Sequence, residues 1–153
     1  MMPAGYASSL EHLADELARA EQLVRAQTQR WRESIASTKP DDKWGMAYVD
    51  QAEVDRYLAA PFRLTGLSSE HGAGTESAAD TLAAGHRRAA ADRASEIAAR
   101  VQVTAPDVPL RLHLLVRRFG LDSTECDLLL LCLLPELDSR FRRLYGYLHD
   151  DVD

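Results

Sequence analysis

The sequence predicts an all-α fold, a helical bundle of about five to six helices that begins with one long helix. Alanine and leucine dominate the apolar residues and aromatic residues make up only 7% of the chain, whereas strands favour β-branched and aromatic residues. Apolar residues recur at steps of three and four, which is the period of a helix face. Several candidate helix starts carry a polar capping residue followed three positions later by Glu. Together these patterns exclude a mainly β fold.

The first predicted helix spans roughly thirty residues, from a capping box at Ser8 and Glu11 to the breaker at Pro40. Its apolar stripe has two interpretations. The favoured one is an ordinary core helix that packs within its own domain. The other is a protruding helix or coiled coil that docks a partner, because about three heptads are enough for a short seam. The partner-docking candidates are then Leu10, Leu13, Leu17, Val24 and Trp31.

The middle of the chain predicts one short helix followed by a linker. The short helix covers about 51–60 and ends at Pro61. The segment 65–85 is rich in Gly, Ser, Thr and Ala and has few apolar residues, a composition typical of a mobile linker, with some helix possible after Ser77. The predicted organisation is therefore an N-terminal helical segment 1–64, the linker 65–85 and a helical core segment 86–153.

The core segment predicts four helices in close succession. An Ala-rich helix covers about 86–103, and Pro109 can open the next, which ends at Gly120 as a left-handed terminator. A capping box at Asp122 to Glu125 begins a Leu-rich helix to Leu134. This helix is apolar nearly all round, so we expect it to be the central buried element.

The residues that follow predict a last helix and buried thiols. Pro135 is expected to start a new segment, in which Leu137, Phe141, Leu144, Tyr145 and Leu148 form a helical stripe. Cys126 and Cys132 lie too far apart along one helix to form a disulfide, so both are expected to be buried thiols.

The sequence predicts no catalytic, cofactor-binding or metal-binding residue. A phosphate loop needs a strand, a Gly-rich turn and a Gly-Lys-Ser/Thr ending, and the Gly72 to Thr75 stretch has neither the strand nor the Lys. The five His are widely spread, without the short spacings of a metal site. Glu125, Asp127, Glu136 and Asp138 are better explained by helix starts than by acid–base catalysis.

The charge and the apolar runs limit the possible partners. A formal net charge of −6 argues against nucleic acid, which needs a basic surface. The longest apolar run, 128–135, is far shorter than the ~20 residues of a membrane span, and no secretory signal is present, so we expect a cytoplasmic location and no membrane contact. The basic clusters at 86–88, 117–118 and 140–143 are expected to be solvated faces or to form inter-subunit salt bridges.

From Leu110 onward four steps follow one another in the sequence. They are a Phe-Gly-Leu turn at 119–121, an acid-capped Leu run at 125–134, Pro-Glu-Leu-Asp at 135–138 and a Tyr-x-Tyr-Leu-x-Asp-Asp ending at 145–151. In this order they resemble a segment that precedes the ATPase module in a family of bacterial AAA+ proteins, often associated with extracellular contractile injection systems of the anti-feeding-prophage type. The resemblance covers about the last third of the chain.

This resemblance implies a non-catalytic N-terminal domain of an AAA+ ATPase that aids assembly or remodelling of a contractile injection system. ATP and Mg²⁺ would then belong to a downstream module of a parent enzyme, and the protein partners would be injection-system components or other subunits of the ATPase. Two alternatives stay open. One is a free-standing helical adaptor or dimerisation module, and the other is a winged-helix-like DNA-binding regulator, which the negative charge and the lack of a convincing hairpin disfavour.

Overall fold

The protein is an all-α bundle built around its first helix. The computed structural model describes residues 3–38, 51–59, 62 and 79–149, and in these ranges all regular structure is helical. The six helices there are α1 (Ser9–Thr38), α2 (Gln51–Ala59), α3 (Ala79–Val103), α4 (Arg111–Phe119), α5 (Ser123–Leu137) and α6 (Arg140–His149). The predicted fold class, including the long N-terminal helix, is therefore confirmed.

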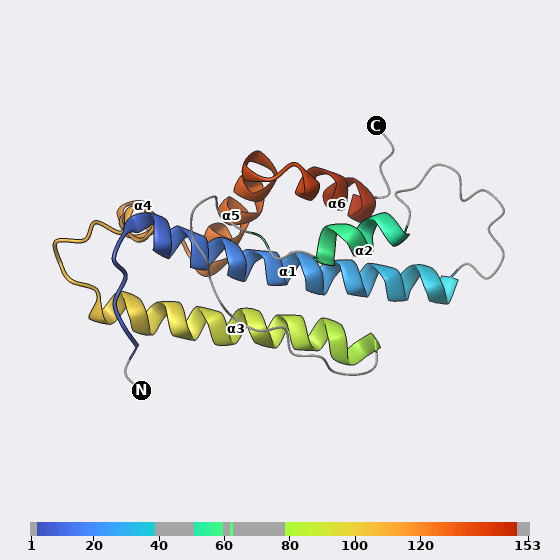
Figure 1. Ribbon diagram of the computed structural model, residues 1–153, viewed down its shortest axis with the longest axis horizontal. Coiled ribbons are helices and arrows are strands. Elements are labelled where there is room, and N and C mark those ends of the chain that lie inside the picture. The colour runs from blue at the N-terminus through green and yellow to red at the C-terminus, as the bar shows by residue number, and fades with distance from the viewer. Residues whose placement is uncertain (1–2, 39–50, 60–61, 63–78, 150–153) are drawn as a thin grey trace.

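Helix α1 lies between two groups of helices. Figure 1 shows α3 running antiparallel along one side of α1, while α2, α5 and α6 lie on the other side and α4 lies near the N-terminal end of α1. One core joins the first and last thirds of the chain, since Leu17 and Val24 of α1 pack with Leu130, Leu134 and Phe141. The segments 1–64 and 86–153 thus share a single hydrophobic core.

A buried carboxylate also holds these helices together. Glu21 of α1 is only 4% exposed, and it accepts two hydrogen bonds from the backbone N–H of Phe62, at 2.9 and 3.0 Å. It also forms ion pairs with Arg25 at 3.1 Å and with Arg140 of α6 at 3.9 Å. Arg140 in turn donates to the carbonyl of Tyr57 in α2. Because buried charges are tolerated when they are paired and hydrogen-bonded, this cluster fixes α2 and α6 against α1.

Helix α3 extends into the expected linker, where the sequence allowed some helix after Ser77. The Ala-rich helix expected from about His86 starts at Ala79, so residues 79–85 of the expected linker are helical, and the rest of that linker lies outside the described residues. Contact with α1 explains the longer helix, because Ala83 is buried and His86 hydrogen-bonds Gln22. Packing of this kind overrides the weak helix propensity of Gly85.

The Leu-rich helix α5 is only half buried, so its prediction as the central buried element was wrong. Leu130 and Leu134 are fully buried, but Leu128 is 57% exposed and Leu129 is 39% exposed. The central position belongs to α1, and α5 packs against it by one side alone. Cys126 is accordingly only half-buried and Cys132 is exposed, which corrects the expectation that both thiols are buried.

Two further details of the C-terminal third differ from the sequence prediction. Pro135 lies inside α5, which continues to Leu137, rather than starting a new segment. Leu137 is 45% exposed and does not join the stripe of α6, whose buried residues are Phe141, Leu144 and Tyr147. A proline in the last turn removes a single backbone hydrogen bond, so the helix can still end two residues later.

Candidate protein-interaction surfaces

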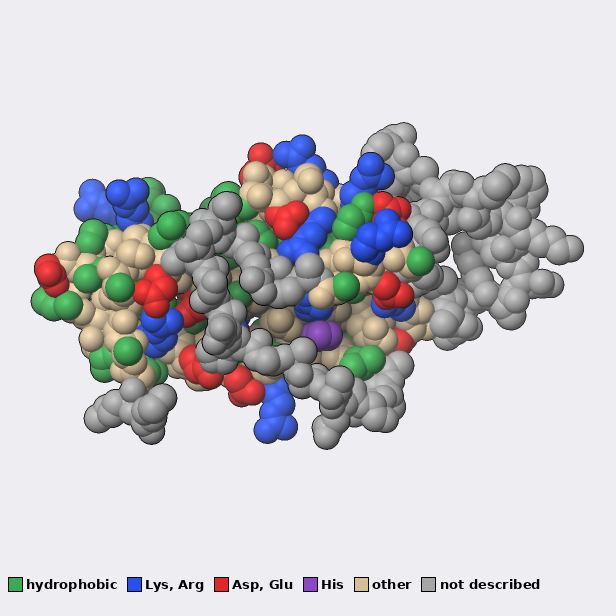
Figure 2. Space-filling model, viewed as in Figure 1, with side chains coloured by type: hydrophobic (Ala, Val, Ile, Leu, Met, Phe, Trp, Pro, Cys, Tyr) green, Lys and Arg blue, Asp and Glu red, His purple; other side chains and the backbone are tan. Residues whose placement is uncertain are grey.

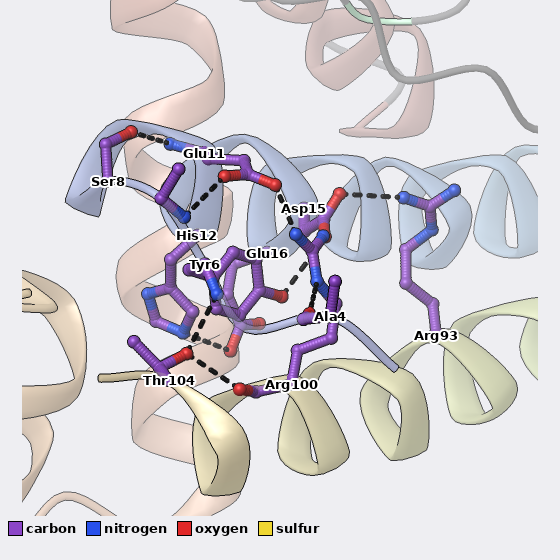
Figure 3. A network of polar contacts seen from close by, with 11 residues as sticks. Ala4, Tyr6, Ser8, Glu11, His12, Asp15, Glu16, Arg93, Arg100 and Thr104 are labelled. Carbon is purple, nitrogen blue, oxygen red and sulfur yellow. Dashed lines mark hydrogen bonds and ion pairs between the residues drawn. The ribbon is translucent and has the colours of Figure 1, made fainter. Parts of the chain in front are cut away.

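A polar network, which we call the clamp, joins the start of the chain to the C-terminal end of α3 (Figure 3). Arg100 of α3 forms ion pairs with Glu11 and with Asp15, the latter at 2.7 Å, and its guanidinium lies 3.9 Å from the centre of the Tyr6 ring. The Tyr6 hydroxyl donates to Asp15 at 3.1 Å, and burial followed by the negative charge of Asp15 raises the pKa of Tyr6. The Tyr6 N–H donates to Thr104 Oγ1 at 2.9 Å. These contacts position the N-terminal end of α1.

The predicted capping box at the start of α1 is formed with one change. The N–H of Glu11 donates to Ser8 Oγ at 3.1 Å, as expected. The carboxylate of Glu11 accepts from the N–H of Ala7, at 2.9 Å, rather than from that of Ser8. Both bonds satisfy backbone donors that a helix start would otherwise leave unpaired.

A hollow of about 570 Å³ opens beside this clamp. Leu10 and Leu13 line it from α1, and Val108, Pro109 and Leu112 line it from the opposite side. Leu10 is 48% exposed, so this lining contains accessible apolar surface. Two of the five docking candidates therefore lie at a concave, mainly apolar site, the usual form of a binding site.

The other three docking candidates lie elsewhere on α1. Leu17 and Val24 are buried in the chain's own core, at 0% and 3% exposure, and Trp31 packs against that core from its edge. The stripe predicted on the first helix is thus divided between intramolecular packing and the hollow. In this structure Leu17 and Val24 contribute to stability and present no surface to a partner.

A second hollow, of about 380 Å³, lies between α1, α3, α4 and the start of α5. His12 lines it and is only 2% exposed, and its Nδ1 has no hydrogen-bond partner among the described residues. Burial lowers the pKa of His12, and the charge of Glu16, whose carboxylate lies 3.9 Å from Nε2, opposes that effect. His12 is therefore a buried imidazole that favours the neutral form.

Helices α4 and α5 are joined by the short turn 120–122, which is the connectivity of a helix–turn–helix unit. Gly120 ends α4 in the left-handed conformation, with φ 66° and ψ 32°, and the N–H of Leu121 donates to the carbonyl of Val116 at 3.0 Å. The capping box of α5 is complete, because Asp122 and Glu125 each accept the other's backbone N–H, at 2.8 and 2.9 Å. Both predicted features of this turn are confirmed. Two helices joined by a short Gly-containing turn are the unit that places a second helix in a DNA groove in many regulators.

The outward face of α5 carries no basic side chain. From Glu125 to Glu136 its exposed side chains follow steps of three and four, so they lie on one face. Helix α5 contains three acidic residues and no Lys or Arg, whereas Arg and Lys make the commonest base contacts of recognition helices. The α5 stripe consists of Glu125, Leu128, Leu129, Cys132 and Glu136.

The outward face of α4 has the opposite charge. None of its residues is buried, and the helix contains three Arg and no acidic residue. Leu114 is 53% exposed, Leu115 is 38% exposed and Phe119 is 73% exposed. Over α4, Figure 2 shows basic and hydrophobic side chains next to each other. The α4 stripe consists of Arg111, Leu114, Leu115, Arg118 and the adjacent Phe119.

Neither stripe was predicted as a candidate site from the sequence. The leucines of α5 were expected in the core, and the basic cluster 117–118 was expected to be a solvated face or to form inter-subunit salt bridges. The available signal was a charge three and four residues before two leucines in each helix, Arg111 in α4 and Glu125 in α5, with a second charge of the same sign later in each helix, Arg118 and Glu136. Charges at both ends of an apolar stripe are typical of a surface rather than a core position.

The described residues contain no cluster of three or more His, Cys, Asp or Glu side chains able to hold a metal ion. In the same part of the chain, no helix is both long enough and apolar enough to cross a membrane.

Comparison with known proteins identifies the family. A family model described as "Winged helix domain, variant" matches residues 2–153. No curated protein and no solved structure matches the chain. No strand occurs in the described ranges, so a β-hairpin wing is not among the elements seen there. Because the match spans nearly the entire sequence and the α4–α5 unit has the connectivity of a helix–turn–helix, the protein belongs to the family of variant winged-helix domains.

Proposed function

We propose that this winged-helix domain binds protein rather than DNA, and that it is the non-catalytic N-terminal domain of an AAA+ ATPase that aids assembly or remodelling of a contractile injection system. The observation that carries the first part is the α5 stripe, where two exposed leucines and two carboxylates lie on a helix that has no Lys or Arg. The resemblance of the segment from Leu110 onward supports the second part.

The electrostatics of the domain support a protein partner. DNA binding releases counterions in proportion to the phosphates that basic residues neutralise. The chain has a formal charge of −6, and α5 itself carries negative charge. Exposed leucines bracketed by charges resemble the apolar centre and polar rim of a protein–protein interface.

A direct experiment compares the two kinds of partner. A fluorescent DNA duplex is titrated with the purified chain at low salt and followed by anisotropy. The proposal predicts no saturable binding at concentrations up to about 100 µM, the weak end of ordinary non-specific affinity. Binding whose affinity falls steeply with salt would instead support a DNA-binding regulator, the second candidate, which the family match favours.

The AAA+ part of the proposal is tested in the gene and in the parent enzyme. The parent reading frame is expected to continue past Asp153 into a Gly-x-x-x-x-Gly-Lys-Ser/Thr stretch, and a frame without one would favour the free-standing adaptor. In the parent enzyme, Leu129→Asp is expected to lower the yield of assembled particles while leaving basal ATP hydrolysis unchanged. Leu82→Asp on α3 is the matched control, because Leu82 and Leu129 are both 39% exposed.

A further inference from the structure

We propose that the α4 stripe of one copy of this chain docks on the α5 stripe of another copy. The inference rests on the proposed protein-binding function and names the partner of these surfaces. Both stripes are exposed apolar surfaces on consecutive helices, and they carry opposite charges. One chain thus supplies both halves of a complementary contact.

The spacing of the residues supports this pairing. In α4 an Arg is followed at three and four positions by Leu114 and Leu115, and in α5 a Glu is followed at the same positions by Leu128 and Leu129. Residues at these steps lie on one helix face. Two leucine pairs can therefore meet at the centre of the contact, with arginines opposite carboxylates at its edges.

The charges that surround the two leucine pairs favour pairing of an α4 stripe with an α5 stripe over pairing of two identical stripes. Pairing α4 with α4 would bring Arg111 and Arg118 against arginines, and pairing α5 with α5 would bring Glu125 and Glu136 against carboxylates. Like charges at an interface disfavour association, whereas opposite potentials steer it. Glu136 also forms a solvent-exposed pair with Arg142 at 3.4 Å, and such a pair is weak enough to exchange for a new partner.

The α4 stripe and the α5 stripe of one chain do not cover each other. The turn 120–122 joins α4 directly to α5, and Gly120 is held in its left-handed conformation by the backbone bond from Leu121 to Val116. Leu114 and Leu128 both remain more than half exposed in the folded chain. The contact between the stripes must therefore form between copies.

The test uses two variants with one damaged stripe each. Leu114→Ser/Leu115→Ser alters the α4 stripe, Leu128→Ser/Leu129→Ser alters the α5 stripe, and Leu82→Ser is the exposure-matched control. Sedimentation equilibrium is run over micromolar to submillimolar concentrations, with far-UV circular dichroism as the check on folding. The wild type and the control are expected to exceed the monomer mass of 17.0 kDa as concentration rises, and each double variant is expected to associate at least about tenfold more weakly.

Mixing the two double variants gives the decisive result. One variant keeps an intact α4 stripe and the other an intact α5 stripe, so their mixture is expected to form one-to-one pairs although each alone stays monomeric. Arg111→Glu/Arg118→Glu is a second α4 variant that retains all leucines, and it is expected to lose association as well.

Three outcomes would overturn the inference. They are a wild type that remains monomeric at submillimolar concentration, a mixture that does not associate, and a variant that associates like the wild type after losing one stripe. A monomeric wild type that also fails to bind DNA would refute the self-pairing alone, whereas salt-dependent DNA binding would refute the proposed function itself.

Discussion

The half-buried position of α5 predicts that two leucines in one helix differ sharply in their contribution to stability. Leu130 is fully buried, and replacing a buried Leu by Ala typically costs about 2–5 kcal/mol. Leu128 is 57% exposed, so less than half of its surface is covered by the fold. Full burial of a leucine side chain contributes about 1.5–3 kcal/mol, and we therefore expect Leu128→Ala to cost about 1 kcal/mol or less.

Urea unfolding followed by circular dichroism measures this difference. At low micromolar protein concentration, where association between copies contributes little, Leu130→Ala should lower the midpoint by about 1 M urea and Leu128→Ala by a small fraction of that. Leu134→Ala is a second buried comparison, since Leu134 is also fully buried. Equal losses for Leu128 and Leu130 would refute the arrangement in which α5 packs on α1 by one side.

Three further predictions concern the ends of helices and the buried imidazole. Gly5→Ala should destabilise the fold by about 1–3 kcal/mol, because the new Cβ would lie 2.8 Å from the backbone at Val103 and Thr104. In Gly85→Ala the new Cβ meets no atom within 4 Å, so this variant should stabilise α3 by about 0.5–1 kcal/mol. The melting temperatures of the two variants should therefore shift in opposite directions. Asp122→Ala removes one half of the α5 capping box and should cost about 1 kcal/mol in urea unfolding, an effect that an uncapped helix start would not show. Because the pKa of His12 is lowered in the folded chain, the unfolded chain binds a proton at His12 first as the pH falls. The stability that neutral His12 allows is therefore present above pH 6.5 and is lost as the pH falls below that value toward the folded pKa. The urea midpoint of His12→Gln should depend less on pH between 7.5 and 5.5 than that of the wild type, and an equal dependence would exclude His12 as the cause of the pH effect.

Local signals predicted most of the helical framework. The length of α1, the left-handed end of α4 at Gly120 and the capping box of Asp122 and Glu125 are each determined by residues close in sequence, and each was predicted correctly. The sequence allowed some helix after Ser77 but did not place the start of α3 at Ala79, because Ala83 is buried by a tertiary contact with no local signature. Contacts between distant segments decide such boundaries.

The apolar pattern of the sequence misplaced the exposed surfaces for a related reason. A helix that is apolar all round predicts burial on every side, but burial also requires neighbours to cover each face. In this chain α1 takes the central place, and none of the described helices covers Leu128 and Leu129 fully. Part of the docking stripe expected on α1 lies in the core instead, because Leu17 and Val24 are buried there.

One measurement tests the central claim that the helix–turn–helix unit contacts protein through its exposed leucines. Leucine methyl resonances are recorded by NMR while the concentration of the chain is raised, and then after addition of a DNA duplex. We predict concentration-dependent shifts at Leu114, Leu115, Leu128 and Leu129, no shifts at the buried Leu17 and Leu130, and no response to DNA. Methyl shifts confined to α1, or a response of α4 and α5 to DNA alone, would contradict this account.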